Sequence, residues 1–82
     1  GMINKLLFPV SDTRYQAVIT VGRFGRKIFT QPRRWKWLAR WNANNYCCCE
    51  MRETSYYIQE VVDTDYKVGA YMFHPDGAID PL

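Results

Sequence analysis

Long apolar runs are missing from this chain, and so is a leader in which a charged start precedes an apolar stretch. Because a membrane-spanning helix needs roughly 18 or more such residues, we expect a cytoplasmic protein without membrane association. Histidine is limited to His74, which lies in a Pro-Gly turn sequence. No Gly-x-Ser-x-Gly motif surrounds Ser11 or Ser55, so neither serine is typical of a nucleophile. The sequence therefore predicts no catalytic residue and a protein that is not an enzyme.

Cysteine occurs only as the run Cys47-Cys48-Cys49, which excludes a disulfide framework that joins distant parts of the chain. If this run is a strand, Cys47 and Cys49 share a face. A tetrahedral zinc site then needs two further ligands, and only His74 is available. We therefore expect reduced thiols in a reducing compartment, packed as small apolar side chains, with no metal and no cofactor.

Acidic residues are absent between Thr13 and Cys49, a stretch that holds eight basic residues. From Glu50 onward the balance reverses, with seven acidic residues against Arg52 and Lys67. Such a division either neutralises itself across neighbouring elements or leaves a positive face on the protein. An acidic partner and internal pairing are both compatible with this pattern.

Apolar and aromatic residues are plentiful, at 48% and 16% of 82 residues, and predict one packed domain over residues 2–82. The tail, residues 74–82, is expected to be poorly ordered. Residues 55–62 are rich in strand formers but also fit a short helix. Strand-like segments separated by short turns are found at residues 15–21, 26–31, 46–53 and 66–73. This layout predicts a mainly β protein, with an antiparallel meander that forms a strongly curved sheet or a small barrel.

Residues 34–41 contain all three tryptophans and alternate large rings with basic side chains. The alternation favours a strand, which the asparagine-rich residues 42–45 would join to residues 46–53 in a hairpin. In that register Trp35 opposes Arg52. The alternative is an α+β protein in which residues 32–43 form a helix packed on the sheet, with Pro32 in its first turn. Because tryptophan rings bury large areas, we expect the three rings to lie mostly inside.

The function that we rank first is a small non-catalytic binding module that associates with itself, as a homodimer, or with another protein through opposed basic and acidic faces. The alternative is weak, largely nonspecific nucleic-acid binding through the basic and aromatic residues 23–41. A second alternative is a small ligand held in an aromatic-lined cavity. The candidate residues for an acidic partner or nucleic acid are Arg23, Arg26, Lys27, Arg33, Arg34, Lys36 and Arg40. The residues available for stacking are Trp35, Trp37 and Trp41.

Overall fold

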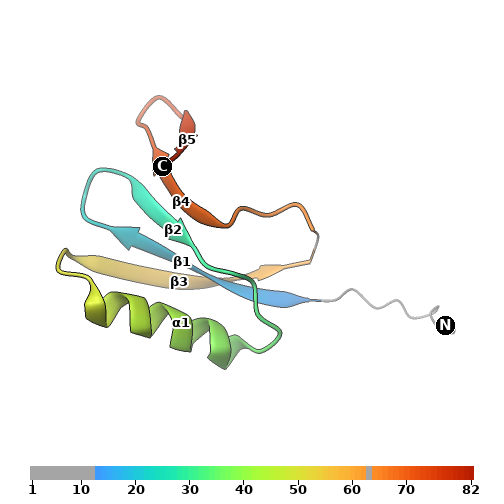
Figure 1. The fold of residues 1–82 in the computed structure, drawn as a ribbon. Coiled ribbons are helices and arrows are strands. Elements are labelled where there is room, and N and C mark those ends of the chain that lie inside the picture. Colours follow the sequence, from blue (N-terminus) through green and yellow to red (C-terminus); the bar gives the residue numbers. More distant parts are fainter. Residues whose placement is uncertain (1–12, 63) are drawn as a thin grey trace, which may run out of the picture.

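The computed structural model describes residues 13–62 and 64–82 and is drawn in Figure 1. Within these residues, five strands form one sheet and a single helix packs on it. The elements, in chain order, are β1 (Arg14–Val21), β2 (Arg26–Phe29), α1 (Lys36–Cys49), β3 (Thr54–Val61), β4 (Gly69–Phe73) and β5 (Ile79–Pro81). The predicted domain also includes residues 2–12, which lie outside the described residues.

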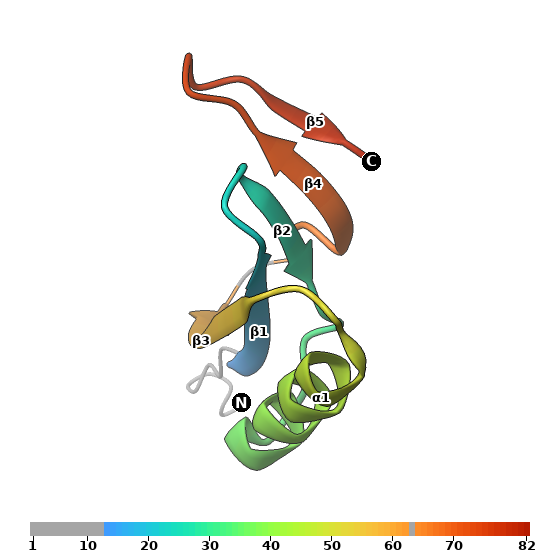
Figure 2. The ribbon, with the colours of Figure 1, turned by 90° about the vertical axis from the view of Figure 1, so that its left-hand side faces the viewer.

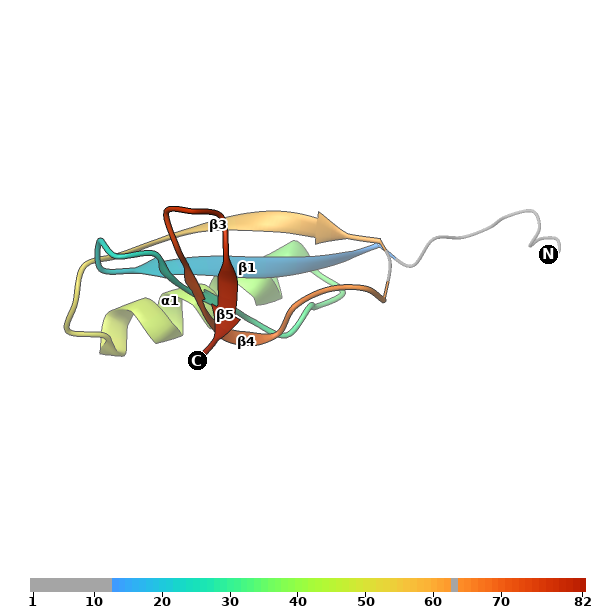
Figure 3. The ribbon, with the colours of Figure 1, turned by 90° about the horizontal axis from the view of Figure 1, so that it is seen from above.

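The strands are arranged in the order β3-β1-β2-β4-β5, and every neighbouring pair is antiparallel. β1 and β2 form one hairpin and β4 and β5 form another, while β3 lies at the edge beside β1 (Figure 3). The prediction of a mainly β, antiparallel fold is confirmed. The sheet remains open and does not close into a barrel.

Strand β1 is the centre of the domain because it is buried on both of its faces. Ala17, Ile19 and Val21 pack with Ala43 of α1 in the main core. The alternate residues Gln16 and Val18 point to the other face of the sheet and are also fully buried. Helix α1 packs against β1 and β3, so the β4–β5 hairpin extends away from it without a helix on either face (Figure 2).

The helix overturns the prediction that residues 34–41 and 46–53 are two strands of a hairpin. The alternative of a helix at residues 32–43 is closer, although α1 begins at Lys36 and continues to Cys49. Ala39, Ala43 and Cys47 follow one another at four-residue spacing and face the sheet. The two alanines let the helix backbone approach β1 closely, and this packing outweighs the poor helix propensity of residues 42–45.

The other strand predictions agree with the structure to within a few residues. Residues 15–21, 26–31 and 66–73 overlap β1, β2 and β4, and the ambiguous residues 55–62 coincide with β3. Residues 74–82, for which the sequence predicts little order, contain a turn and the short strand β5. No helix in the described part of the chain has both the length and the hydropathy needed to cross a membrane.

Candidate nucleic-acid interface

The three tryptophan rings are exposed, which overturns the prediction that they are mostly buried. Trp35, Trp37 and Trp41 are 54%, 64% and 56% exposed. Residues two apart on a helix are about 200° apart around its axis. Because Ala39 and Ala43 face the sheet, Trp37 and Trp41 point outward, one helical turn apart. The core closes without the rings because β1 is covered on both faces and α1 packs on it through small side chains.

Basic side chains surround these rings at the start of α1. The Arg34 guanidinium lies 5.7 Å from the centre of the Trp35 ring, and the Lys36 ammonium lies 5.8 Å from the centre of the Tyr15 ring. Arg40 is exposed on the first turns of the helix. The first turn has no acidic residue, so the positive end of the helix dipole adds to these charges.

The exposed rings and cations at the start of α1 are here called the Trp–Arg face. It consists of Arg34, Trp35, Lys36, Trp37, Arg40 and Trp41. Arg33 lies directly before it and is held by two 2.7 Å backbone hydrogen bonds with Tyr15. Within the described residues, no carboxylate forms an ion pair with any cation of this face. As far as the structure describes the chain, the positive charge of this face lies next to large aromatic surfaces and is not paired with a carboxylate.

The remaining predicted residues lie elsewhere on the molecule. Arg23 and Arg26 flank the turn between β1 and β2, whereas the helix start adjoins Tyr15 near the opposite end of β1. Lys27 is on the sheet face that α1 does not cover. Its ammonium lies 5.7 Å from the centre of the Phe73 ring and donates a 3.2 Å hydrogen bond to the Thr20 hydroxyl. Residues 23–41 therefore do not form one continuous binding surface.

Among the described residues, the acidic side chains from Glu50 onward form an ion pair with Arg23 but with no cation of the Trp–Arg face. Arg23 forms a 3.3 Å ion pair with Glu53, and both side chains are largely exposed, so this pair contributes little stability. Glu50 pairs instead with Arg52, which lies in the same acidic segment two residues further along the chain. Internal pairing thus accounts for Arg23 but not for the cations of the Trp–Arg face.

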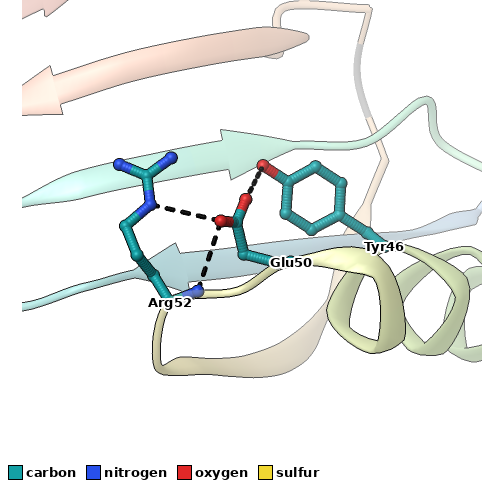
Figure 4. A network of polar contacts seen from close by, with 3 residues as sticks. All are labelled: Tyr46, Glu50 and Arg52. Carbon is teal, nitrogen blue, oxygen red and sulfur yellow. Dashed lines mark hydrogen bonds and ion pairs between the residues drawn. The ribbon is translucent and has the colours of Figure 1, made fainter.

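A three-residue network at the end of α1 has no counterpart in the sequence-based predictions (Figure 4). The Tyr46 hydroxyl donates to one Glu50 oxygen at 3.1 Å, and the Arg52 Nε donates to the other at 3.2 Å. The hydrogen bond from Arg52 holds the pKa of Glu50 below its ordinary value. Burial, followed by the bond to Glu50, raises the pKa of Tyr46. Arg52 therefore lies at the end of α1, paired with Glu50. The predicted hairpin register, in which Arg52 opposes Trp35, is wrong.

Comparisons with known proteins add nothing to this geometry. Family models, curated protein sequences and solved structures each gave no match to the chain. Functional inference therefore rests on the residues themselves. In the part of the chain that the structure describes, no three histidine, cysteine or acidic side chains converge as metal ligands.

The cysteine run ends α1, and the prediction that all three thiols are packed is only partly right. Cys47 packs against the core, but Cys48 and Cys49 are exposed because their positions turn away from the sheet. Their sulfur atoms lie 3.8 Å apart. The hydrogen bond between the two thiols, and the repulsion that a Cys49 thiolate would add, raise the pKa of Cys48.

This pKa shift predicts slow alkylation of Cys48 near neutral pH. The thiolate is the reactive form, so iodoacetamide should modify Cys48 more slowly than a free cysteine at pH 8, and the rate should continue to rise above pH 9. Replacing Cys49 with alanine, which can form no side-chain hydrogen bond, should move the pH profile of Cys48 to lower pH, whereas Cys47→Ala should move it less. Mass spectrometry of quenched samples measures each rate. An unchanged Cys48 profile in the Cys49→Ala variant would contradict the shared hydrogen bond.

Proposed function

We propose that this protein binds single-stranded nucleic acid through the Trp–Arg face. The observation that carries the proposal is the exposure of Trp35, Trp37 and Trp41 among cations that have no carboxylate partner in the described residues. Exposed aromatic rings beside basic side chains are the combination that single-strand binding proteins use, because bases stack on rings while cations follow the phosphates.

The geometry favours a flexible strand over a duplex. Trp37 and Trp41 project from successive turns of α1, whose rise of 1.5 Å per residue separates their backbone positions by about 6 Å along the helix axis. Bases of a single strand are free to unstack and lie on such rings, whereas the bases of a duplex are paired and stacked on one another. Arg34, Lys36 and Arg40 supply charge around the start of α1, and contacts from such cations to phosphates carry no sequence preference of their own.

The test is a titration with a fluorescently labelled single-stranded oligonucleotide of about 12 nucleotides, a length within the usual site sizes. Each stacked base contributes about 1–3 kcal/mol, so the double variant Trp37→Ala, Trp41→Ala should bind at least about 30-fold more weakly. Fluorescence anisotropy measures the affinity without relying on the rings that are removed. Arg34→Gln and Arg40→Gln should each reduce the slope of log affinity against log salt by about 0.7.

Tyr57→Ala is the matched control, because Tyr57 is a 51% exposed aromatic residue on β3 and not on α1. The Tyr57→Ala variant should bind the oligonucleotide with the same affinity as the original protein. A matching duplex should bind more weakly than the single strand at high salt, where stacking persists and phosphate contacts fade. Equal affinity of the double tryptophan variant and the Tyr57 control would overturn the proposal.

A second candidate function is self-association, which the edge strand β3 favours. β3 is eight residues long and, among the described residues, pairs only with β1, so the backbone groups on its other side have no strand partner there and could pair with a second chain. Sedimentation of the protein used for the titration distinguishes the two candidates. A homodimer without any oligonucleotide binding, even at low salt, would replace nucleic-acid binding with self-association.

A further inference from the structure

A cavity of about 450 Å³ lies beside the turn between β1 and β2, near the end of α1 that is distant from the Trp–Arg face. It is called here the arginine cavity. Three guanidinium groups and one carboxylate border it, together with apolar side chains. The residues that matter to the argument are Arg23, Arg26, Arg52, Glu53, Phe24 and Met72.

Arg26 is the residue that points to a missing ligand. It lies opposite Val21 and Met72 in the sheet register, on the side of the sheet that carries α1. Its Nε atom is buried and has no hydrogen-bond acceptor within the described residues. The other two arginines differ, because Arg23 pairs with Glu53 and Arg52 pairs with Glu50. Arg26 itself is only half-buried and lines the cavity, so an anion bound there would lie next to a guanidinium group whose Nε has no acceptor within the described residues.

The walls of the cavity indicate the class of anion. Three arginines and Glu53 line the cavity, and Glu50 pairs with Arg52, so the group carries an excess of one positive charge, which favours an anionic ligand. Guanidinium groups bind phosphate oxygens through paired N–H donors. Phe24 is 88% exposed at the rim and Met72 contributes an apolar wall, so the rest of the ligand meets an aromatic ring and a thioether.

We propose that the arginine cavity binds a phosphate monoester carried on an aromatic group, with Arg26 and Arg52 on the phosphate and Phe24 against the aromatic part. A nucleoside 5′-monophosphate and the 5′-phosphorylated end of a nucleic-acid strand share this chemistry. The arginine cavity shares no residue with the Trp–Arg face, so the two proposals can be tested independently.

The backbone around the cavity holds these groups in place. Gly25 directly precedes Arg26 and has a φ of 92°, and its carbonyl accepts a 2.8 Å hydrogen bond from the Phe73 backbone. Glu50 accepts from both the side chain and the backbone N–H of Arg52 (Figure 4). The two cations assigned to the phosphate therefore extend from positions that the fold fixes, which reduces the ordering cost of binding.

Calorimetric titration of the full 82-residue protein with adenosine 5′-monophosphate tests the proposal, with adenosine and inorganic phosphate as partial ligands. The monophosphate should bind more tightly than either part, and Arg26→Gln should weaken it about tenfold or more. Lys27→Gln is the matched control, because it removes a neighbouring charge on the opposite face of the sheet, and its affinity should not change. Arg52→Gln, a change near the exposed rim, should also weaken binding and guards against a folding defect in the Arg26 variant.

Two oligonucleotides that differ only in a 5′-phosphate distinguish the sources of the ligand. Tighter binding of the phosphorylated strand, lost in Arg26→Gln, assigns the cavity to a strand end, whereas equal binding of both strands assigns it to a free nucleotide. Absence of monophosphate binding at millimolar concentration would overturn the proposal. Equal affinities of the original protein, Arg26→Gln and Arg52→Gln would overturn it as well.

Discussion

Replacing Gly25 with alanine should destabilise the domain by about 2–5 kcal/mol. Gly25 has a φ of 92°, a conformation that costs a residue with a Cβ about 1–2 kcal/mol. A Cβ at this position would also overlap the carbonyl oxygen of Phe73, which belongs to the backbone of β4 and has no side-chain freedom. β2 and β4 would have to separate, so an overpacking cost of about 1–3 kcal/mol is added.

Gly22→Ala is the matched control for this change. Gly22 also has a positive φ, of 72°, but a Cβ there meets no atom within 4 Å. Gly22→Ala should therefore lower the free energy of unfolding only by the cost of the positive φ, about 1–2 kcal/mol. Urea denaturation of both variants, analysed with a common slope, measures the difference. A Gly25 variant as stable as the Gly22 variant would show that β4 moves away from β2 at no cost.

Replacing Gln16 with leucine should cost about 2–4 kcal/mol, although leucine is of similar size. The fully buried Gln16 amide donates to the Thr30 carbonyl at 2.8 Å and to the Lys67 carbonyl at 2.6 Å, and its oxygen accepts from Gln59 at 2.8 Å. Each group left without a partner costs about 1–3 kcal/mol where water does not reach it. Leucine offers none of these three bonds.

The connection from β3 to β4 gives this prediction a second measurement. β3 and β4 lie on opposite sides of the β1–β2 hairpin, so the connection crosses the sheet end and is held there by the bond from Gln16 to Lys67. Limited proteolysis next to Lys67 should accelerate in Gln16→Leu. Gln59→Leu, which removes one of the three bonds, should cost about 1 kcal/mol and leave this connection protected. Equal proteolysis of the two variants would contradict the role assigned to Gln16.

Local sequence patterns predicted β1, β2 and β4 because β-branched and aromatic residues between turn sequences are typical of strands. In β1, Ala17, Ile19 and Val21 share the face that packs against α1, although the strand is buried on both faces. The strand prediction for residues 34–41 and 46–53 was wrong because the alternation of aromatic rings favoured a strand. The four-residue spacing of Ala39, Ala43 and Cys47, which indicates a helix, is a weaker pattern. Alanine carries little weight in a pattern analysis, yet its small size is the reason why a helix fits there.

The candidate sites were predictable in residue type but not in grouping. Arg34, Trp35 and Lys36 lie close together because they are adjacent in the sequence, whereas the predictions of a strand and of buried rings at residues 34–41 were both wrong. The arginine cavity is different, because Arg26 and Arg52 are brought together by the passage of α1 over the sheet. The predicted hairpin register placed Arg52 opposite Trp35, and so it did not predict the arginine cavity.

The edge position of β3 has a consequence for the order in which the chain folds. β1 and β2 join through a short turn, whereas the β1–β3 ladder joins Val21 with Thr54 and Arg14 with Val61. Closing these longer loops costs more chain entropy and is slower. We therefore expect β3 to pair with β1 after the β1–β2 hairpin has formed. Until then, the edge of β1 is open to pairing with strands of other chains.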